Sequence, residues 1–326
     1  MASAIHQLLA QAALGIQRSE QRLAALRMEI VGKNAYLAQH QQLGGEEEEV
    51  EFVVEEDTLK AMECEQRGEM EAAKQFHLSA FDKLIQIDPP TESSARGLAA
   101  FASFAVRNLD EGVELDEEQI SEAFDCVGDF PAVAASVECE RAVFLGFTLG
   151  DSPKAWESFK LAKAGFPEDV QLLCNYARFV DSVLVQEAEE DGDLACIPEL
   201  KELASELYVE ALEIDPAIPS ALVNLSAIYV EQSREKALLA ERTLLLEQAR
   251  ALLLSALKQG EERAEMAMMH YNLACIECLL EGKASPECAT HLKKAVGLDP
   301  SLRGAIVQDP DLSSVRHEKW CLALLK

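Results

Sequence analysis

Apolar residues near the start of the chain recur at alternating steps of four and three positions. The stripe, which also passes through the polar Ser19 and Lys33, consists of Ile5, Leu9, Ala12, Ile16, Leu23, Leu26, Ile30 and Leu37. Such a heptad seam is typical of an amphipathic helix that pairs with another helix. We therefore expect a coiled-coil-type helix over residues 1–43, in which residues 5–37 pair either with their own chain or with a partner.

A glycine pair, Gly44-Gly45, ends this pattern, and the acidic run EEEEVEFVVEED follows it. The run fits two interpretations: a solvated acidic linker over residues 44–56, or the exposed start of the next helix. Runs of like charge repel one another and are usually solvated, which favours the linker.

From about residue 57 onward, helix-length periodic segments alternate with short turns. The prolines lie where a helix should begin or end, positions at which proline removes no helical hydrogen bond. They are Pro89, Pro90, Pro131, Pro153, Pro167, Pro198, Pro216, Pro219, Pro286, Pro300 and Pro310. Only VEFVV has a strand-like composition, and no hairpin turn accompanies it. The sequence predicts an all-α fold.

Four segments of the chain end alike, with a bulky residue, a small or apolar residue three positions later and a proline five beyond that. They are FDKLIQIDPP (81–90), FKLAKAGFP (159–167), YVEALEIDP (208–216) and LKKAVGLDP (292–300). A second motif recurs as NYARFV (175–180), NLSAIY (224–229) and NLACIE (272–277). These segments resemble the second and the first helix of the tetratricopeptide repeat (TPR), and the clearest copy is Ala155, Phe159, Ala162 and Pro167.

The resemblance implies a right-handed α-α superhelix, a TPR-like solenoid, over residues 57–302, with its strongest support in 136–300. Residues 303–326 resemble a closing segment, in which Trp320 and the leucines shield the end of the stack. Stacked hairpins of this kind leave a concave groove lined by the first helices, and that groove usually binds an extended peptide or a partner helix.

Acidic residues outnumber basic ones by 58 to 29, which gives a formal charge of −29. This balance argues against direct nucleic-acid binding and favours basic partners. No apolar run approaches the length of about 18 residues that a membrane-spanning helix needs. The nine cysteines are scattered through apolar segments, as in reducing compartments. We expect a cytoplasmic protein, with the nucleus, or an organelle if the N-terminus is a transit peptide, as alternatives.

Three asparagines occupy equivalent places in the first-helix motif: Asn175, Asn224 and Asn272. In the TPR resemblance this position faces the groove, where an amide can offer one donor and one acceptor to a peptide backbone. Neighbouring residues that complete the predicted partner-binding set are Gln171, Arg178 and Tyr271. The alternative is that the asparagines are solvated or bonded to the neighbouring helix. Chaperone-tail binding is disfavoured, because no Lys/Arg pair flanks the asparagines.

The sequence CIEC…CATH gives four residues a spacing that zinc sites use: Cys275, Cys278, Cys288 and His291. The repeat register directs the first two cysteines toward the groove and Cys288 toward the hairpin interior. The four side chains should therefore not converge, and we expect neither a metal nor another cofactor.

An acidic segment, QEAEEDGD (186–193), is expected to form a loop between the two helices of one repeat. TPR-type histone chaperones also carry an acidic interruption within a repeat. The loop is either simply solvated or binds a basic client.

Catalytic signatures such as a P-loop, GxSxG or HExxH do not occur in the sequence. The remaining histidines show no pairing with a nucleophile or with one another: His6, His40, His77, His270 and His317. We expect a non-enzymatic TPR adaptor or scaffold that holds a peptide or helix of a protein partner in its groove. One alternative is an acidic chaperone for a basic client such as a histone or ribosomal protein. Another is a structural subunit of a large complex, docked through the N-terminal helix.

Overall fold

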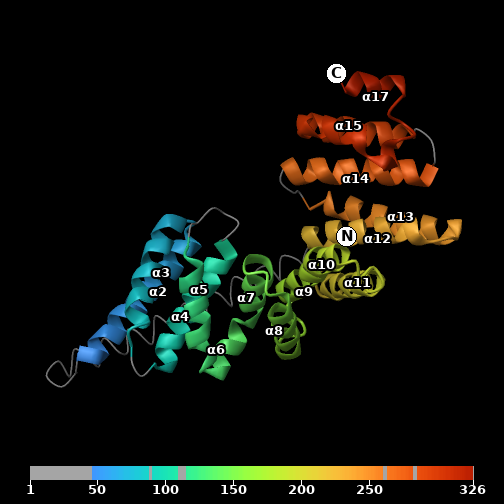
Figure 1. The fold of residues 1–326 in the computed structure, drawn as a ribbon. Coiled ribbons are helices and arrows are strands. Elements are labelled where there is room, and N and C mark those ends of the chain that lie inside the picture. Colours follow the sequence, from blue (N-terminus) through green and yellow to red (C-terminus); the bar gives the residue numbers. More distant parts are fainter. Residues whose placement is uncertain (1–45, 88–89, 109–114, 260–262, 282–284, 326) are drawn as a thin grey trace. The chain divides into compact units, whose positions relative to one another are not determined.

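The structure, a computed structural model, describes residues 46–87, 90–108, 115–259, 263–281 and 285–325. Every regular element within these ranges is helical, and VEFVV belongs to a helix. The all-α prediction is therefore confirmed for the described part of the chain (Figure 1). The heptad helix predicted over residues 1–43 lies outside the described residues.

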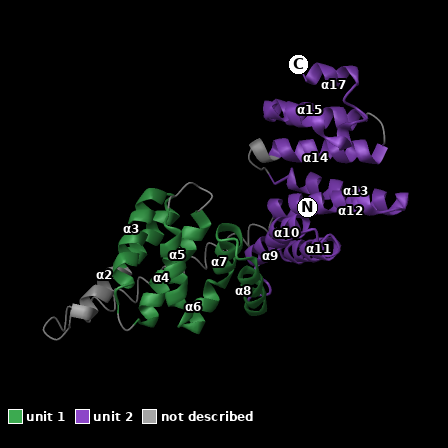
Figure 2. Ribbon diagram, viewed as in Figure 1, with its two compact units in different colours: residues 1–165 green, residues 166–326 purple. Residues whose placement is uncertain are grey.

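The chain divides into two compact units, residues 1–165 and 166–326 (Figure 2). The first unit contains α2 (Glu46–Gln66), α3 (Met70–Leu84), α4 (Glu92–Asn108), α5 (Glu117–Gly128), α6 (Pro131–Ser136), α7 (Glu138–Val143), the π-helical turn η2 (Phe144–Thr148) and α8 (Ser152–Gly165). Its core is rich in phenylalanine, since Phe81, Phe101 and Phe144 are all buried.

The second unit begins with a long first helix, which comprises α9 (Val170–Arg178), the π-helical turn η3 (Phe179–Leu184) and α10 (Val185–Asp191). The helices that follow are α11 (Ile197–Ile214), α12 (Pro219–Glu235), α13 (Leu239–Ala256), α14 (Arg263–Glu281) and α15 (Pro286–Leu298). The chain closes with the 3₁₀ turn η4 (Pro300–Leu302), α16 (Arg303–Gln308), the 3₁₀ turn η5 (Pro310–Leu312) and α17 (Lys319–Leu324).

The two acidic runs of the sequence are both largely helical. Helix α2 begins at Glu46, so the expected linker over residues 44–56 is helical from that residue onward. The expected acidic loop over residues 186–193 is also helical, as α10, as far as Asp191. Gly192 then ends the helix with a left-handed φ of 75°, a conformation that suits glycine because it has no Cβ. Glutamate has a high helix propensity, which outweighs the repulsion between neighbouring charges here.

Helices that follow one another in the chain pack in pairs. In the second unit, α9 packs with α11, α12 with α13, and α14 with α15, and each pair also contacts the next. Short connections make these pairs antiparallel hairpins, like the hairpins of a helical repeat protein. The arrangement of these hairpins in a right-handed superhelix stays a prediction.

The second helix of each pair carries a buried triplet at positions i, i+4 and i+7. The four predicted copies are all buried: Phe81 and Leu84 on α3, joined by His77; Ala155, Phe159 and Ala162 on α8; Tyr208 and Ala211 on α11, joined by Ala204; Leu292 and Ala295 on α15, joined by Cys288. Helix α13 carries the same triplet in Ala249, Leu253 and Ala256, each with no exposed surface. The sequence comparison missed this copy because no proline follows it.

The C-terminal segment packs on the last hairpin. Leu302, Ile306 and Leu312 are buried in one apolar cluster with residues of α14 and α15, and Trp320 packs against that cluster while partly buried. Arg234 of α12 also bonds Asp311 at 2.5 Å. These contacts cover apolar surface that the last hairpin would otherwise expose to water.

Candidate partner-binding surfaces

The three predicted asparagines lie on the first helices of successive pairs, α9, α12 and α14, and all are half-buried. On α9, the side-chain oxygen of Asn175 accepts a hydrogen bond from Nε2 of Gln171, one turn earlier, at 3.2 Å. Gln171 and Arg178 are exposed. This part of the predicted surface is accessible to a partner.

The side chain of Asn224 makes a hydrogen bond within the protein. Its Nδ2 donates to the hydroxyl of Tyr208 on α11 at 2.9 Å. Tyr208 is 1% exposed, and burial raises the pKa of its hydroxyl, so the group stays neutral. At this position the structure matches the alternative interpretation, an asparagine bonded to the neighbouring helix.

Tyr271 does not lie on an open groove wall. It is buried beside Asn272, and its hydroxyl donates to Asp309 at 2.8 Å. Burial, followed by the bond to Asp309, raises the pKa of Tyr271. The side chain therefore ties α14 to the C-terminal segment, and its assignment to the partner-binding set is corrected.

An apolar groove that the sequence did not predict runs between α11 and α13, over α12. It is a shallow depression of about 440 Å³ that is widely open to solvent. Its lining residues are Val209, Leu212 and Glu213 of α11; Leu222, Leu225 and Tyr229 of α12; and Gln248, Ala251, Leu252 and Ser255 of α13. We call this the α11–α13 groove. In the sequence, the groove is marked only by Val209, an apolar residue that shares its face of α11 with glutamates.

The floor of the α11–α13 groove is one face of α12, because Leu222, Leu225 and Tyr229 follow the i, i+3, i+7 spacing. Asn224 is off that face. The groove is therefore formed by second helices above a first helix, whereas the predicted binding wall consists of first helices alone.

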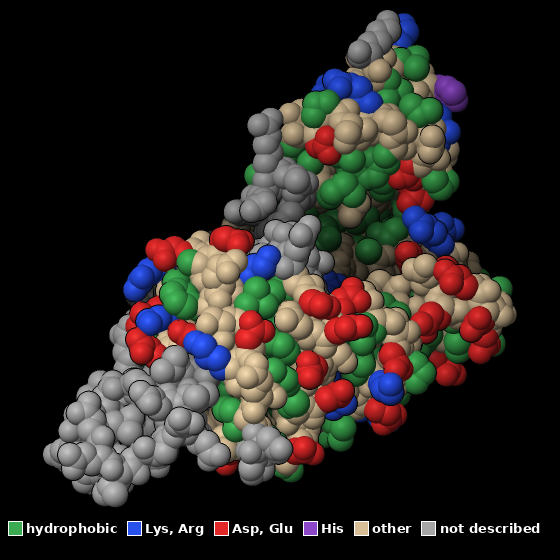
Figure 3. All heavy atoms as spheres, turned by 60° about the vertical axis from the view of Figure 1, so that its left-hand side comes forward, with side chains coloured by type: hydrophobic (Ala, Val, Ile, Leu, Met, Phe, Trp, Pro, Cys, Tyr) green, Lys and Arg blue, Asp and Glu red, His purple; other side chains and the backbone are tan. Residues whose placement is uncertain are grey.

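The rim of the α11–α13 groove is acidic. On α11, Glu202, Glu206 and Glu213 are exposed and share the i, i+3, i+4 stripe of Val209. The single base of that helix, Lys201, is paired with Glu231 of α12. Glu213 itself lines the groove, so the acidic side of the rim is the α11 side. On α13, the exposed Glu241 lies two turns before Gln248, and the exposed Lys258 lies about one turn beyond Ser255. Acidic side chains are also spread over the face of the molecule drawn in Figure 3.

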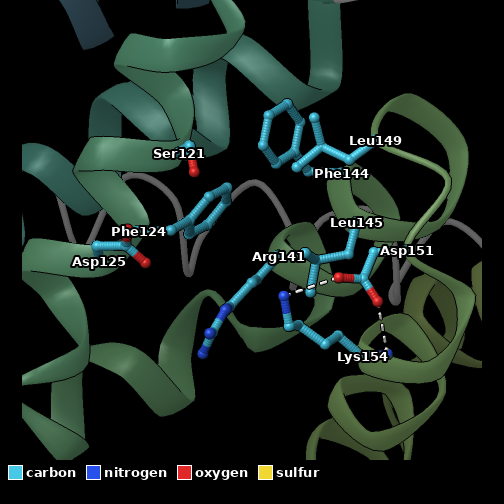
Figure 4. A pocket seen from close by; sticks show the side chains of 9 residues that line it. All are labelled: Ser121, Phe124, Asp125, Arg141, Phe144, Leu145, Leu149, Asp151 and Lys154. Carbon is cyan, nitrogen blue, oxygen red and sulfur yellow. Dashed lines mark hydrogen bonds and ion pairs between the residues drawn. The ribbon is translucent and has the colours of Figure 1, made fainter.

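A second cavity, in the first unit, lies between α5, α7, η2 and the start of α8 and encloses about 400 Å³ (Figure 4). Its apolar wall is formed by Phe124, Phe144, Leu145 and Leu149. Its charges are of both signs and partly paired: Nζ of Lys154 lies 2.8 Å from Asp151, and Arg141 lies 3.9 Å from Glu138. The charged residues that line the cavity are two acids and two bases, so their formal charges sum to zero.

The residues of the possible zinc motif separate into three contacts. His291 contacts His270, and their Nδ1 atoms are 2.9 Å apart. Sγ of Cys275 lies 3.5 Å from a carboxylate oxygen of Asp309. Cys278 and Cys288, which the repeat register placed on different sides, face each other with their sulfurs 2.8 Å apart. The prediction that these two cysteines lie on different sides was wrong, because the first turn of α15, which holds Cys288, packs against α14.

Cys275, Asp309 and Asp311 have ligand atoms within 4.8 Å of one another. The two carboxylates already accept hydrogen bonds from Tyr271 and Arg234, respectively. Burial and the nearby carboxylates raise the pKa of Cys275, which keeps its thiol protonated. These contacts make the group a hydrogen-bonded anchor that ties α14 and α12 to the C-terminal segment.

Among the described residues, no helix is both long and apolar enough to cross a bilayer. Comparison with protein-family models and with curated proteins found no match to this chain.

Proposed function

We propose that the protein is a non-enzymatic adaptor that binds a basic amphipathic helix of a protein partner in the α11–α13 groove. The observation that carries the proposal is an apolar groove bordered by exposed glutamates. It combines two expectations from the sequence, a TPR-like adaptor and a surface that attracts basic clients.

Apolar side chains in the groove supply the affinity. Val209 is 36% exposed, and Leu212, Tyr229 and Leu252 are each partly exposed above the buried floor. Covering such surface releases about 25 cal/mol for each Å² removed from water. A helix that presents leucine-type side chains at i, i+3, i+4 and i+7 is the form of partner that fits an elongated groove between two helices.

Glutamates on the rim supply the selectivity. Glu206 and Glu213 flank Val209 on α11, and Glu213 lines the groove itself. A partner helix with lysine or arginine beside its apolar face meets these carboxylates, whereas an acidic helix is repelled. Charges arranged in this way act mainly on the association rate and on the choice of partner.

Two other proposals predict different behaviour. A chaperone that masks a basic client through surface charge alone would lose its client at high salt, because exposed charges more than about 10 Å apart are screened at 0.1 M. A structural subunit docked through residues 5–37 would depend on that segment, so its assembly size would change when residues 1–45 are deleted.

The proposal is tested with two synthetic helices of about 18 residues that share the same leucine spacing, one carrying lysines and the other glutamates. Fluorescence anisotropy should detect binding of the lysine peptide and little binding of the glutamate peptide. Val209→Lys should weaken binding of the lysine peptide roughly tenfold or more, because it places a charge in the apolar groove and repels the lysines of the peptide.

The matched control is Leu161→Lys, a change at an equally apolar residue on α8 that is 65% exposed and lies outside the groove. It should leave the affinity unchanged. Equal weakening by both variants, or equal binding of both peptides, would contradict the proposal.

A further inference from the structure

Two buried cysteines on adjacent helices face each other in the second unit. Cys278 lies near the end of α14 and Cys288 in the first turn of α15, and they are 3% and 0% exposed. Their sulfurs are 2.8 Å apart, within about 1 Å of the disulfide bond length of about 2.05 Å. A small movement of either side chain would bring the sulfurs to bonding distance.

The hydrogen bonds of the pair distinguish the two thiols. The two thiols share one hydrogen bond, in which either sulfur can be the donor. The bond with Cys288 lowers the pKa of Cys278 against the opposing effect of burial, and a bond with Ser314 adds to the lowering. The contact with Cys278 and burial raise the pKa of Cys288. Because the bond with Ser314 falls on Cys278, we take Cys278 as the nucleophile of the pair.

The neighbouring cysteines are unsuited to the same role. Cys275 faces Asp309, and burial and that carboxylate raise its pKa. Cys321 is fully buried in the same apolar cluster, and burial raises its pKa as well. An oxidant that reaches the cluster should therefore react first at Cys278.

We propose that Cys278 and Cys288 are an oxidation site that closes into a disulfide when the protein meets hydrogen peroxide. The Cys278 thiolate attacks one peroxide oxygen, the O–O bond breaks, and the hydroxide released takes up a proton to leave as water. The sulfenic acid formed on Cys278 is attacked by the Cys288 sulfur, which loses its proton, and a second water departs. Two thiols and one peroxide thus give one disulfide and two waters.

The cross-link would fasten α15 to α14. The nine residues between the two cysteines, 279–287, would become a closed loop, which restricts the unfolded chain and stabilises the hairpin. Because both sulfurs are buried, oxidation requires a brief local opening of the hairpin and should be slow.

The test treats the full-length protein with hydrogen peroxide, alkylates the remaining thiols and maps tryptic peptides without reduction. Residues 264–283 should be joined to residues 284–293, and the melting temperature should rise by about 5 °C. Cys275→Ser should retain the cross-link and Cys288→Ser should lose it.

The control variant is Cys174→Ser, because Cys174 is a buried cysteine on α9, away from the cluster. It should leave both the cross-link and its rate unchanged. A cross-link through Cys275 or Cys321, or sulfinic acid at Cys278 without a cross-link, would overturn the proposal. So would unoxidised Cys278 and Cys288 after a peroxide treatment that lasts as long as iodoacetamide needs to alkylate both thiols in the untreated protein, since that alkylation requires the same local opening. Any variant that fails to fold is replaced by the corresponding alanine variant.

Discussion

The contact between Asn224 and Tyr208 assigns a structural role to a residue that the repeat pattern suggests for partner binding. The tyrosine hydroxyl is buried, and the asparagine amide donates to it at 2.9 Å. Leaving a buried polar group without a partner costs more than the hydrogen bond contributes when it is formed. This asymmetry explains why the side chain turns toward α11.

We predict that Asn224→Ala lowers the free energy of unfolding by about 1 kcal/mol, or the melting temperature by about 2–4 °C. Tyr208→Phe should have a similar effect, and the double variant should cost less than the sum because both changes break one contact. Urea unfolding of the three variants measures this. If the double variant costs the full sum of the two single variants, the contact between Asn224 and Tyr208 does not stabilise the fold. If Asn224→Ala leaves the stability unchanged and weakens peptide binding, Asn224 belongs to the partner-binding residues.

At the residue scale, the sequence placed the three asparagines correctly on first helices, since the motif fixes their position along the chain. It did not find their partners. Tyr208 is 16 residues from Asn224, and Asp309 is 38 residues from Tyr271. Such pairs depend on how helices pack, which the local pattern does not contain.

At the scale of elements, ion pairs link neighbouring hairpins. Arg250 of α13 lies 3.7 Å from Glu277 of α14, and the glutamate side chain is 8% exposed. Burial raises the pKa of Glu277, while the arginine opposes that rise. The arginine therefore stabilises a carboxylate that burial alone would protonate.

We predict that Arg250→Met destabilises the protein by on the order of 1 kcal/mol at pH 8, less than for a fully buried pair because Arg250 is partly exposed. Without the arginine, the folded-state pKa of Glu277 rises further above its unfolded value. A raised carboxyl pKa makes the fold more stable as the pH falls, so the cost should be smaller at pH 5 than at pH 8.

Thermal unfolding of the wild type and the variant at both pH values measures this difference. Arg96→Met is the control, because Arg96 pairs with Glu92 on an exposed surface and should cost little at either pH. A cost for Arg250→Met that is the same at both pH values would show that the arginine contributes through packing rather than charge.

The helices themselves were largely predictable because proline and apolar periodicity mark their ends and faces. The errors arose where charge was used to assign structure, in residues 46–56 and 186–191, which are helical. The buried triplet of α13 was missed for a related reason. The sequence motif ends in a proline, whereas the packing of α13 in its hairpin depends only on Ala249, Leu253 and Ala256.

At the scale of the whole molecule, the α11–α13 groove depends on three helices whose lining residues extend from 209 to 255. Each helix alone has an ordinary amphipathic pattern, and the exposed apolar strip exists only after α11 and α13 pack on α12. The charge of −29 was evident from composition, but the concentration of glutamates along this rim was not. Solvent exposure, and therefore the groove, could not be derived from the sequence.

Mapping where the lysine peptide contacts the protein shows whether the α11–α13 groove is its binding site. A photoreactive leucine analogue on the apolar face of the peptide is cross-linked to the full-length protein, and the modified residues are identified by mass spectrometry. If the peptide binds in the groove, cross-links form within 209–213, 222–229 and 248–255 and are lost in Val209→Lys. Cross-links concentrated at Gln171, Asn175 and Arg178, or scattered over the surface, would show that it does not.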